Sequence, residues 1–438
     1  MKKKNIIAVA TAALIAFSAS QGFAQEAAEA AAPAPASDTS VFVFNTLLFL
    51  VSGMVVMFMA AGFCMLEAGL VRSKNAATIC LKNIALYSVA GLMVYLIGYQ
   101  LIYGVTEGGV IAPFQLIWRG DESESIGNGY SAHSDWYFQM VFVATAASIV
   151  SGTLAERIKL FPFLIFVALL TGFIYPIQAG WVWGGGWLDA RFDDFAGSTL
   201  VHSTGGWAAL AGALVLGPRT GKYVGAKVTP IPGSNLPLAT LGTFILWLGW
   251  FGFNGGSQLA LGTISDATDV SKIFVNTNMA ACGGVVTALI LTQILYKKVD
   301  LTIVLNGAIG GLVAITAEPL QPAIWQAILI GAVGGVIVSV AVPVLDKFKI
   351  DDVVGAIPAH LFCGIWGTLI VPLSNDGVNF FGQLTGVIAI GVFVFVISLI
   401  CWLALKFTLG IRASDEDERL GLDKAELGLE AYPEFSKG

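Results

Sequence analysis

Long apolar runs, separated by short polar connections, follow one another along the chain after its first forty residues. A helix needs about 20 predominantly apolar residues to cross the hydrocarbon core of a bilayer, and eleven runs are long enough. The pattern predicts an all-α polytopic membrane protein with eleven transmembrane helices. These are expected near residues 42–68, 78–103, 135–154, 160–180, 196–217, 237–261, 274–295, 301–317, 322–344, 353–372 and 380–406.

The Lys and Arg residues of the connections fall mostly on one side of the predicted membrane. The five connections that include "VRSKN", "AERIK" and "DKFK" hold eleven basic residues, whereas the alternate connections hold three, Arg119, Arg191 and Lys272. Cytoplasmic loops carry an excess of Lys and Arg. The basic connections are therefore predicted to face the cytoplasm. This places the mature N-terminus outside and, after an odd number of helices, the tail at 407–438 inside the cell.

The first 24 residues, "MKKKNIIAVATAALIAFSASQGFA", combine a lysine cluster, a short apolar core and small residues near their end. Such a segment is typical of a cleaved signal peptide. The Ala- and Pro-rich stretch at 25–41 is predicted to be an extracytoplasmic linker, because it cannot bury a core. A signal peptide followed by many spans predicts a multi-pass protein of the cell inner (plasma) membrane.

Composition narrows the class of partners. Hydrophobic residues make up 56% of the chain and charged residues 12%, whereas a soluble domain is about 25% charged. The net charge of −6 comes without a basic stripe, so membrane lipid is expected as a partner and nucleic acid is not. The cysteines are interpreted as small buried side chains, with no disulfide or metal site predicted. They are Cys64, Cys80, Cys282, Cys363 and Cys401.

The predicted helices divide into two equal sets of opposite orientation. Helices one to five, at 42–217, and six to ten, at 237–372, run in opposite senses because each set has an odd number of members. This arrangement predicts a transmembrane domain at 42–406, built from two inverted five-helix repeats and one additional helix at 380–406. Transporters with inverted repeats bind their substrates at the interface between the repeats.

Two of the chain's three histidines lie inside predicted helices at matching positions. His202 follows Asp194 by eight residues in the fifth helix, and His360 follows Asp352 by eight residues in the tenth. At 1.5 Å per residue, each imidazole lies about 12 Å from its own membrane face, near the midplane. Such matching histidines favour a shared functional site over two unrelated structural residues. His133, in the polar segment "SAHSDW", is interpreted as a solvated residue.

A pair of neutral imidazoles suits a narrow class of solutes. A neutral imidazole both donates and accepts a hydrogen bond, so facing rings can pass a small polar molecule along a narrow lumen. Glu67 is the main other ionisable residue deep in a predicted helix, and no carboxylate chain for sodium or proton coupling is predicted. Without full negative charge, the lumen suits a neutral or readily deprotonated solute better than a metal cation. Bis-histidine haem ligation is the alternative, although one pair would hold one haem and there is no CxxCH motif.

Several longer motifs point to a known family. They are "AERIK" at 155–159, "WVWGGGWL" at 181–188, "DFAGSTLVHSTGG" at 194–206, "LGWFGFNGGS" at 248–257, "DDVVGAIPAHLFCGIWG" at 351–367 and "GIRASDEDERLGLDKAELGLEAY" at 410–432. Together they resemble the ammonium transporter family, the Amt/Mep/Rh superfamily, on its Amt side, over about 42–433. The resemblance implies selective transport of ammonium or ammonia through a hydrophobic pore in each subunit of a homotrimer. Neither enzymatic activity nor a cofactor is expected.

The resemblance implies an outer recruitment site for ammonium. Trp183 and Ser257 match the recruitment residues, with Phe142 and Phe138 completing an aromatic wall. A cation over aromatic faces gains about 0.5 to 2 kcal/mol. A serine oxygen can also accept a hydrogen bond from N–H, and together these contacts partly replace lost water. By position alone, Trp183 is also typical of an interfacial aromatic belt.

Deeper in the pore, Phe142 and Phe253 match the family's stacked gate, although either residue alone is also typical of helix packing. His202 and His360 match the twin histidines of the lumen, which ammonium is expected to pass after it has lost a proton. Asp194 matches an aspartate that supports the recruitment region structurally. By position alone it is also a helix N-cap, since it precedes an apolar helix.

Two parts of the chain depart from the family pattern. Gly355 stands five residues before His360, where the family often has an aspartate, and Pro358 stands two before it. The tail has "LGL" at 427–429 in place of the usual "HGE". In relatives this tail couples the subunits and meets a PII-type signalling protein, so a PII-type partner is predicted. The alternative function is an ammonium sensor that signals through the tail, which the lack of an appended kinase or cyclase domain before Gly438 disfavours.

Overall fold

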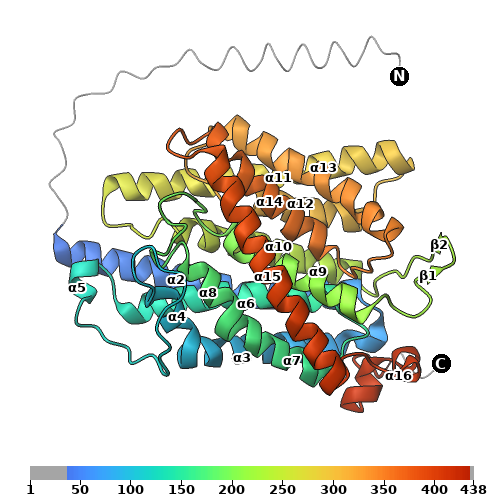
Figure 1. Ribbon diagram of the computed structural model, residues 1–438. Helices are drawn as coiled ribbons and strands as arrows, with labels where there is room; N and C mark the ends of the chain where they lie inside the picture. Colours follow the sequence, from blue (N-terminus) through green and yellow to red (C-terminus); the bar gives the residue numbers. More distant parts are fainter. Residues whose placement is uncertain (1–36, 435–438) are drawn as a thin grey trace, which may run out of the picture. The chain divides into compact units, whose positions relative to one another are not determined.

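The computed structural model describes residues 37–434, mostly as helices (Figure 1). The predicted signal peptide at 1–24 and most of the predicted linker at 25–41 lie outside the described residues. Ser37 begins the described chain as the N-cap of its first helix and accepts a hydrogen bond from the backbone N–H of Ser40. This is the side-chain chemistry that helix starts prefer.

The first half of the described chain contains six helical segments, several of which change winding along their length. They are α2 (Asp38–Leu70); η2 (Ser73–Asn75), α3 (Ala76–Met93), η3 (Val94–Gly98) and α4 (Tyr99–Tyr103); α5 (Ser125–Asn128); α6 (Ala132–Thr153); α7 (Leu160–Leu169), η4 (Leu170–Ile174) and α8 (Tyr175–Gly180); and η5 (Ser198–Ser203) with α9 (Thr204–Leu216).

A short antiparallel hairpin joins the two halves, with Tyr223 of β1 (Tyr223–Val224) opposite Val228 of β2 (Lys227–Val228). The helices that follow are α10 (Leu236–Gly256), α11 (Ile264–Tyr296), α12 (Leu301–Ile315), α13 (Ile324–Lys347), η6 (Ile357–Phe362) with α14 (Cys363–Ile370) and η7 (Val371–Leu373), α15 (Phe380–Thr408), α16 (Asp415–Leu420) and η8 (Asp423–Leu427).

Eight helices of the described chain are long and apolar enough to cross a membrane. They are α2, α10, α11, α13, α15 and the composite helices η2–α4, α7–α8 and η5–α9. The other three predicted runs are also helical, as the 22-residue α6 and the shorter apolar helices α12 and η6–η7. The chain is therefore a helical multi-pass membrane protein, and the count of eleven spans stays a prediction.

Some helix boundaries differ from those predicted by the apolar runs. α11 begins at Ile264 rather than near 274, because Thr263 and Asp266 form a capping box that starts the helix in polar sequence. α10 ends at Gly256, short of the predicted 261, since consecutive glycines favour a helix end. Hydrophobicity alone misses both signals.

The two halves meet at small residues. α2 and α10 pack along each other, and a Cβ on Gly69 would lie 2.5 Å from the backbone nitrogen of Ala239. At a second contact, a Cβ on Gly364 of α14 would lie 2.3 Å from the carbonyl oxygen of Ser198 in η5. Small residues let membrane helices approach closely, and here they bring the segments that carry the two histidines into contact.

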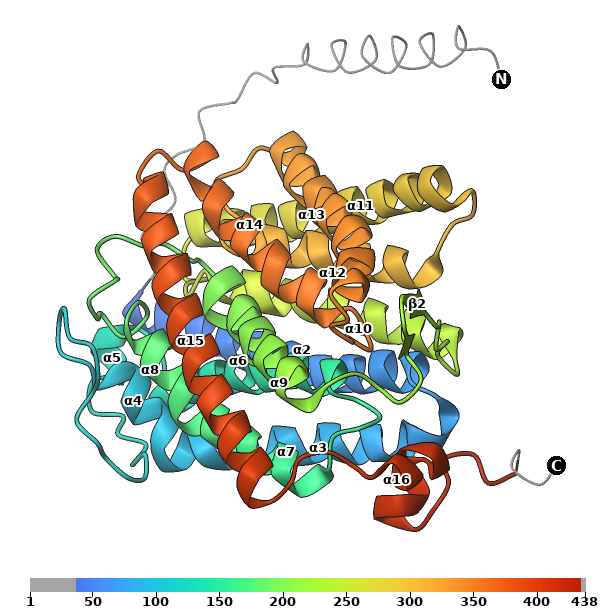
Figure 2. The ribbon, with the colours of Figure 1, turned by 45° about the vertical axis from the view of Figure 1, so that its right-hand side comes forward.

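α15 crosses the neighbouring helices obliquely, as its red ribbon shows in Figures 1 and 2. Its Trp402 stacks on Phe166 of α7 with ring centroids 3.8 Å apart. The Trp402 indole also donates a hydrogen bond of 3.2 Å to the carbonyl of Ala208 in α9. α15 therefore fixes the helices of the first half against one another.

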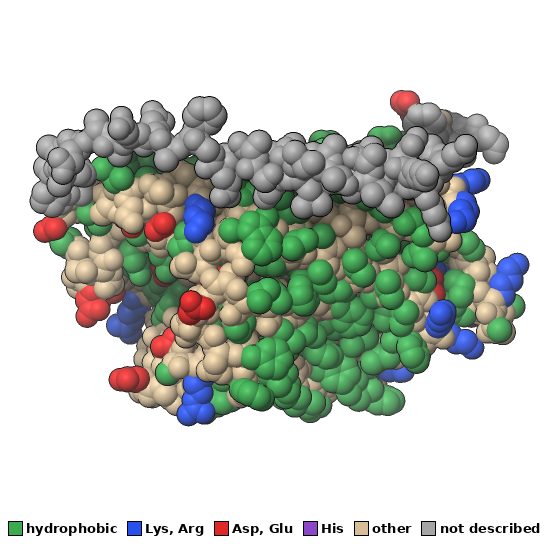
Figure 3. Space-filling model, turned by 90° about the horizontal axis from the view of Figure 1, so that it is seen from above, with side chains coloured by type: hydrophobic (Ala, Val, Ile, Leu, Met, Phe, Trp, Pro, Cys, Tyr) green, Lys and Arg blue, Asp and Glu red, His purple; other side chains and the backbone are tan. Residues whose placement is uncertain are grey.

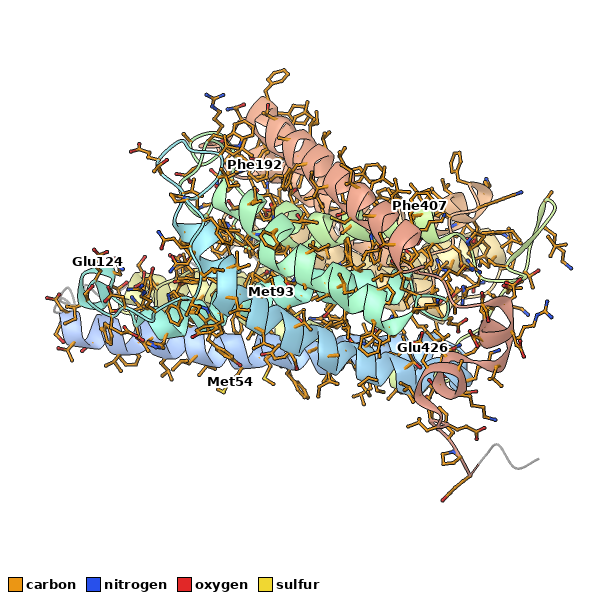
Figure 4. The ribbon with its side chains drawn as sticks, turned by 60° about the horizontal axis from the view of Figure 1, so that its bottom comes forward. Met54, Met93, Glu124, Phe192, Phe407 and Glu426 are labelled. Atoms are coloured by element: carbon orange, nitrogen blue, oxygen red, sulfur yellow. The ribbon has the colours of Figure 1, made fainter. Side chains whose placement is uncertain are left out.

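The described tail packs at the end of the helices that carries the β1–β2 hairpin, here called the tail end; the end where α2 begins is called the opposite end. Asp423 accepts hydrogen bonds from the backbone N–H groups of Ala77 and Thr78 at the start of α3. Figure 4 shows Glu426 at the tail end and Glu124 at the opposite end. On the face seen in Figure 3, apolar side chains fill the middle, and most charges at the tail end are Lys or Arg.

Candidate functional site

The structure brings the two histidines of the helices together. His202, in η5, and His360, in η6, are 0% and 2% exposed, and their Nδ1 atoms lie 3.2 Å apart within hydrogen-bonding distance. Neutral imidazoles can share such a bond because one nitrogen donates while the other accepts. A haem iron ligated by both rings would have to stand between them, so this contact does not fit the haem alternative.

His202 is held by an aspartate cap at the start of its segment. The two carboxylate oxygens of Asp194 accept four backbone N–H bonds of 2.7 to 3.1 Å from residues 197–200. Gly197 makes this possible with a φ of 105°, in the left-handed region that favours glycine. The next turn is π-helical, with the N–H of His202 bonded to the carbonyl of Gly197. Asp194 therefore caps the backbone N–H groups at the start of the histidine segment, three residues before its N-cap position, Gly197.

His360 is held by the same frame in the other half. Asp352 accepts backbone N–H bonds of 3.2 Å from Gly355 and 2.7 Å from Ile357. Its Oδ1 also accepts a 3.1 Å bond from the hydroxyl of Thr153. Gly355, which stands where the family often has an aspartate, has a φ of 79° and supplies the turn. The supporting carboxylate of this half therefore lies eight residues before the histidine, in the same frame of Asp, Gly and His as the first.

A stacked pair of phenylalanines lies next to the histidines. Phe142 of α6 and Phe253 of α10 have centroids 3.9 Å apart at 22° and are 2% and 0% exposed. Phe253 lies 5.3 Å from the ring of His202. The rings of Phe142, Phe253, His202 and His360 therefore form a continuous series.

The predicted recruitment residues lie at different depths around this pair. The Trp183 ring is 6.2 Å from that of Phe142, and its indole donates to the backbone carbonyl of Asp194 at 3.2 Å. Ser257 directly follows α10, and its hydroxyl donates to the carbonyl of Phe253 at 2.8 Å, which leaves its oxygen able to accept a bond. Phe138 is 1% exposed and packs 4.7 Å from Phe142, so it supports that ring from within the core.

A cavity of about 710 Å³ opens at the opposite end and is lined by Trp183, Asp194 and the loop between them. Of the described residues, Phe142 and Ser257 are not among those that line it. Trp183 therefore stands between an open vestibule and the first ring of the stacked pair. Outside this region, His133 is exposed as predicted, and it forms an ion pair with Glu122.

Sequence reasoning missed two aromatic residues that fix the imidazoles. Trp250 stacks on His202 at 4.9 Å and 19°, and its indole donates a 2.8 Å bond to the hydroxyl of Thr316. The ring of Phe63 lies 6.0 Å from that of His360. Trp250 could have been found, because residues three apart share a helix face and it stands three positions before Phe253. Nothing in the sequence around Phe63 distinguishes it from packing.

A buried histidine pair beside stacked phenylalanines, within membrane-crossing helices, is typical of a membrane transport protein. The protein's family follows from its sequence. The chain belongs to the Ammonium Transporter Family, whose model matches residues 47–432, and the resemblance found in the motifs is confirmed.

Relatives of known name agree with this assignment. Ammonium transporter Amt2 of Archaeoglobus fulgidus is 39% identical over 418 residues, which cover 88% of this chain and 87% of that protein. A putative ammonium transporter of Synechocystis sp. is 40% identical over 395 residues, covering 88% and 89%. Among solved structures, one described as a sensor Amt protein matches with a TM-score of 0.84 at 35% identity, covering 89% of this chain and 100% of that one. Candida albicans Mep2 matches with a TM-score of 0.78 at 27% identity, covering 90% and 92%.

Proposed function

We propose that this protein is a selective pore in which ammonium is recruited at the opposite end, loses a proton and crosses past the histidine pair as ammonia. The observation that carries the proposal is the hydrogen-bonded pair of buried imidazoles, 3.2 Å apart, next to a stacked phenylalanine gate. Burying an unpaired charge in such a site costs many kcal/mol, whereas a neutral molecule with hydrogen-bond partners crosses at far lower cost.

Recruitment takes place at the inner edge of the vestibule, where Trp183 stands between the open cavity and Phe142. The Trp183 and Phe142 rings offer aromatic faces to a cation, worth about 0.5 to 2 kcal/mol, and the Ser257 oxygen accepts a hydrogen bond from ammonium. Phe138 supports Phe142, and Asp194 fixes the backbone carbonyl that holds the Trp183 indole. The aspartate thereby acts on the site through structure, with its own oxygens occupied by backbone N–H groups.

Selectivity follows from the loss of a proton. The gate formed by Phe142 and Phe253 has no room for a hydrated ion while its rings are 3.9 Å apart. Ammonium can pass after it has become a small neutral molecule, and each histidine ring then exchanges hydrogen bonds with it. Potassium has no proton to lose, so its full desolvation cost remains.

The proposal includes an orientation and an assembly. The tail end, rich in Lys and Arg, faces the cytoplasm, and the opposite end faces outward from the inner membrane. Residues 42–406 form the transporter domain, with inverted repeats at 42–217 and 237–372 and an eleventh helix at 380–406. Residues 407–438 form a regulatory tail for a homotrimer and a PII-type partner. Support comes from the matching Asp, Gly and His frames of the two halves and from the docking of the described tail on α3.

Currents on solid-supported membranes test the transport function. Purified protein in proteoliposomes should give a current, or a pH rise inside the vesicles, after an ammonium pulse and neither after a potassium pulse. His202→Ala should abolish the ammonium response or admit potassium. An unchanged response and unchanged selectivity in this variant would rule out the proposed role of the histidine pair.

A sensor is the second candidate, favoured by the TM-score of 0.84 to the structure described as a sensor Amt protein. In that case ammonium binding should change the exposure of the tail. Hydrogen exchange over residues 409–434, with and without ammonium, measures this directly. Unchanged exchange together with robust transport would favour the pore alone.

A further inference from the structure

A small, mostly apolar cavity lies on the tail side of the histidine pair. His360, Glu67, Ser148 and Asn306 line it together with apolar side chains. Its volume, open to the centre of a water-sized molecule, is about 10 Å³, which is about the room that one water needs. The cavity therefore connects an imidazole of the pore with a carboxylate that the transport path described above does not use.

Glu67 is held in this cavity with one oxygen left over. The residue is 1% exposed, and its Oε2 accepts bonds of 2.7 Å from the Ser151 hydroxyl and 3.3 Å from the Asn83 amide. Its Oε1 has no hydrogen-bond partner among the described residues. A buried acceptor left unpaired costs about 1–3 kcal/mol. The free Oε1 therefore leaves one acceptor for a molecule in the cavity.

Lys82 supplies the charge that lets a carboxylate stay at this depth. It is 1% exposed, its Nζ donates a 2.9 Å bond to the carbonyl of Ser151, and it lies 4.9 Å from the ring centre of Phe163. Lys82 and Glu67 interact electrostatically but form no direct ion pair in the described chain, whose ion pairs lie elsewhere. Lys82 therefore interacts with the carboxylate without occupying its Oε1.

We propose that Glu67 is the proton-transfer group at the tail-side end of the pore, where ammonia regains its proton; this rests on the proposed transport function. A proton released by ammonium at the recruitment site passes to His202, across the Nδ1–Nδ1 hydrogen bond to His360, and through one cavity water to Oε1 of Glu67. Ammonia that has passed His360 then takes it. The O–H bond of the carboxylic acid breaks, an N–H bond forms, and ammonium and the Glu67 carboxylate are the products.

The test separates charge movement from ammonia entry in proteoliposomes that hold a trapped pH dye. Current is measured on solid-supported membranes and luminal pH by dye fluorescence after the same ammonium pulse. Wild type should give a current with little rise of luminal pH, because the proton accompanies ammonia. Glu67→Gln keeps the shape and removes the titratable group. It should lower the current at least tenfold while luminal pH rises, since ammonia then crosses alone.

Two further variants make the result specific. Glu67→Asp keeps a carboxylate one methylene farther from the cavity, so it should retain part of the current, and it decides the question if Glu67→Gln does not fold. Glu318→Gln makes the same change at another buried carboxylate, which accepts bonds from Leu320, Gln321 and Asn375 away from this cavity. It should leave both readouts at wild-type values.

Each other outcome has a distinct meaning. The role of Glu67 is overturned if folded Glu67→Gln gives the same current and pH response as wild type. If Glu67→Gln does not fold, an unchanged current in Glu67→Asp overturns it instead. Loss of both current and ammonia entry in a variant with a wild-type melting temperature also overturns it, because the residue would then serve passage itself. If the wild-type protein gives a rise of luminal pH without a current, the ammonia pore is supported and the proton relay is ruled out. If wild type shows neither signal, the transport function itself fails.

Discussion

The segments that carry His202 and His360 share one local design but differ in what surrounds the imidazole. Each begins with an aspartate, has glycine at a positive φ three positions later, and places histidine in a π-helical turn five residues after the glycine. The His202 ring lies against Trp250 and Phe253. The His360 ring instead faces a cavity that also contains Glu67. The same local frame thus places His202 among aromatic rings next to the stacked phenylalanines, and His360 next to the cavity that contains Glu67.

The two aspartate caps also differ in strength and in neighbours. Asp194 accepts four backbone N–H bonds and is 1% exposed. Asp352 accepts two such bonds and one from Thr153. The residue before it, Asp351, forms a buried ion pair with Arg219 at the tail end. The first segment is therefore fixed mainly by its own backbone, and the second partly by contacts with other elements.

The largest expected difference is in the transport of ammonium and potassium by the His202→Ala and His360→Ala variants. His202→Ala removes the first polar group after the gate, and a lost hydrogen bond to a desolvated solute costs about 1.5–3 kcal/mol, or roughly ten- to a hundredfold in rate. His360→Ala breaks the proposed relay to Glu67 and should therefore also lower the ammonium current, but it should keep potassium excluded, because the gate and His202 remain. Initial currents after ammonium and potassium pulses measure both effects. Equal losses of selectivity in the two variants would show that the rings are equivalent.

The second largest expected difference is in the stability lost when Asp194 or Asp352 is replaced by alanine. Asp194→Ala leaves four buried N–H donors unpaired, at about 1–3 kcal/mol each before any water enters, so it should prevent accumulation of folded protein or lower the melting temperature strongly. Asp352→Ala should cost roughly half as much. Thermal melting in detergent measures this order, with Asp194→Asn and Asp352→Asn as controls that keep one acceptor oxygen. The reverse order would contradict the assignment of Asp194 as the stronger cap.

Replacing Gly197 or Gly355 by alanine should give a smaller difference in melting temperature, again with the larger loss in the first segment. In Gly197→Ala, the new Cβ would lie 2.5 Å from Cγ2 and 3.1 Å from Cβ of Val201. In Gly355→Ala it would lie 2.7 Å from Nδ2 of Asn306, the end of a longer side chain that can move. Alanine at positive φ should destabilise both variants by about 1–2 kcal/mol. Gly197→Ala should lose more, because its Cβ meets the branched side chain of Val201. Equal melting temperatures would argue against this steric account.

Much of the fold could be predicted from the sequence, because membrane-spanning helices need long apolar runs. Each predicted run is helical in the structure. The matching positions of His202 and His360 in the two sets of helices predicted a shared site, where their rings lie in contact, and the motifs identified the family. What the runs could not show is where helices begin in polar sequence, as with the capping box at Thr263 and Asp266. Local hydrogen bonding sets such ends, and hydropathy does not report it.

The polar neighbourhood of the site was also hidden from the sequence. Glu67 was recognised as an isolated ionisable residue, but its shared cavity with His360 depends on how α2 packs against the second half. Lys82, near the start of an apolar run, donates to the carbonyl of Ser151 in α6 and interacts electrostatically with Glu67 of α2. Only tertiary packing brings these groups together. The eight-residue spacing from Asp352 to His360 was visible in the sequence, but the hydrogen bonds by which Asp352 caps the segment were not.

The smallest expected effect concerns the ion pair next to the second cap. Burial alone would raise the pKa of Asp351, but the Arg219 guanidinium, bonded to both carboxylate oxygens at 2.9 Å, holds it well below its usual range. The stability from this pair is therefore complete above the unfolded pKa of about 3.9 and is lost as the pH falls through the lower folded pKa.

Arg219→Lys tests this dependence because a point charge replaces a two-bond contact. The folded pKa of Asp351 should rise toward its ordinary value, which removes about 1.4 kcal/mol of stability for each pKa unit. The melting temperature should therefore lie below that of wild type near pH 7, and the difference should narrow only as the pH falls below about 3.9 toward the lower folded pKa of Asp351. Lys222→Gln removes the more exposed pair with Asp346 and should change little at any pH. A difference for Arg219→Lys that stays constant with pH would mean that lost packing, rather than the charge of Asp351, explains it. The anchoring of the second histidine segment would then owe nothing to this ion pair.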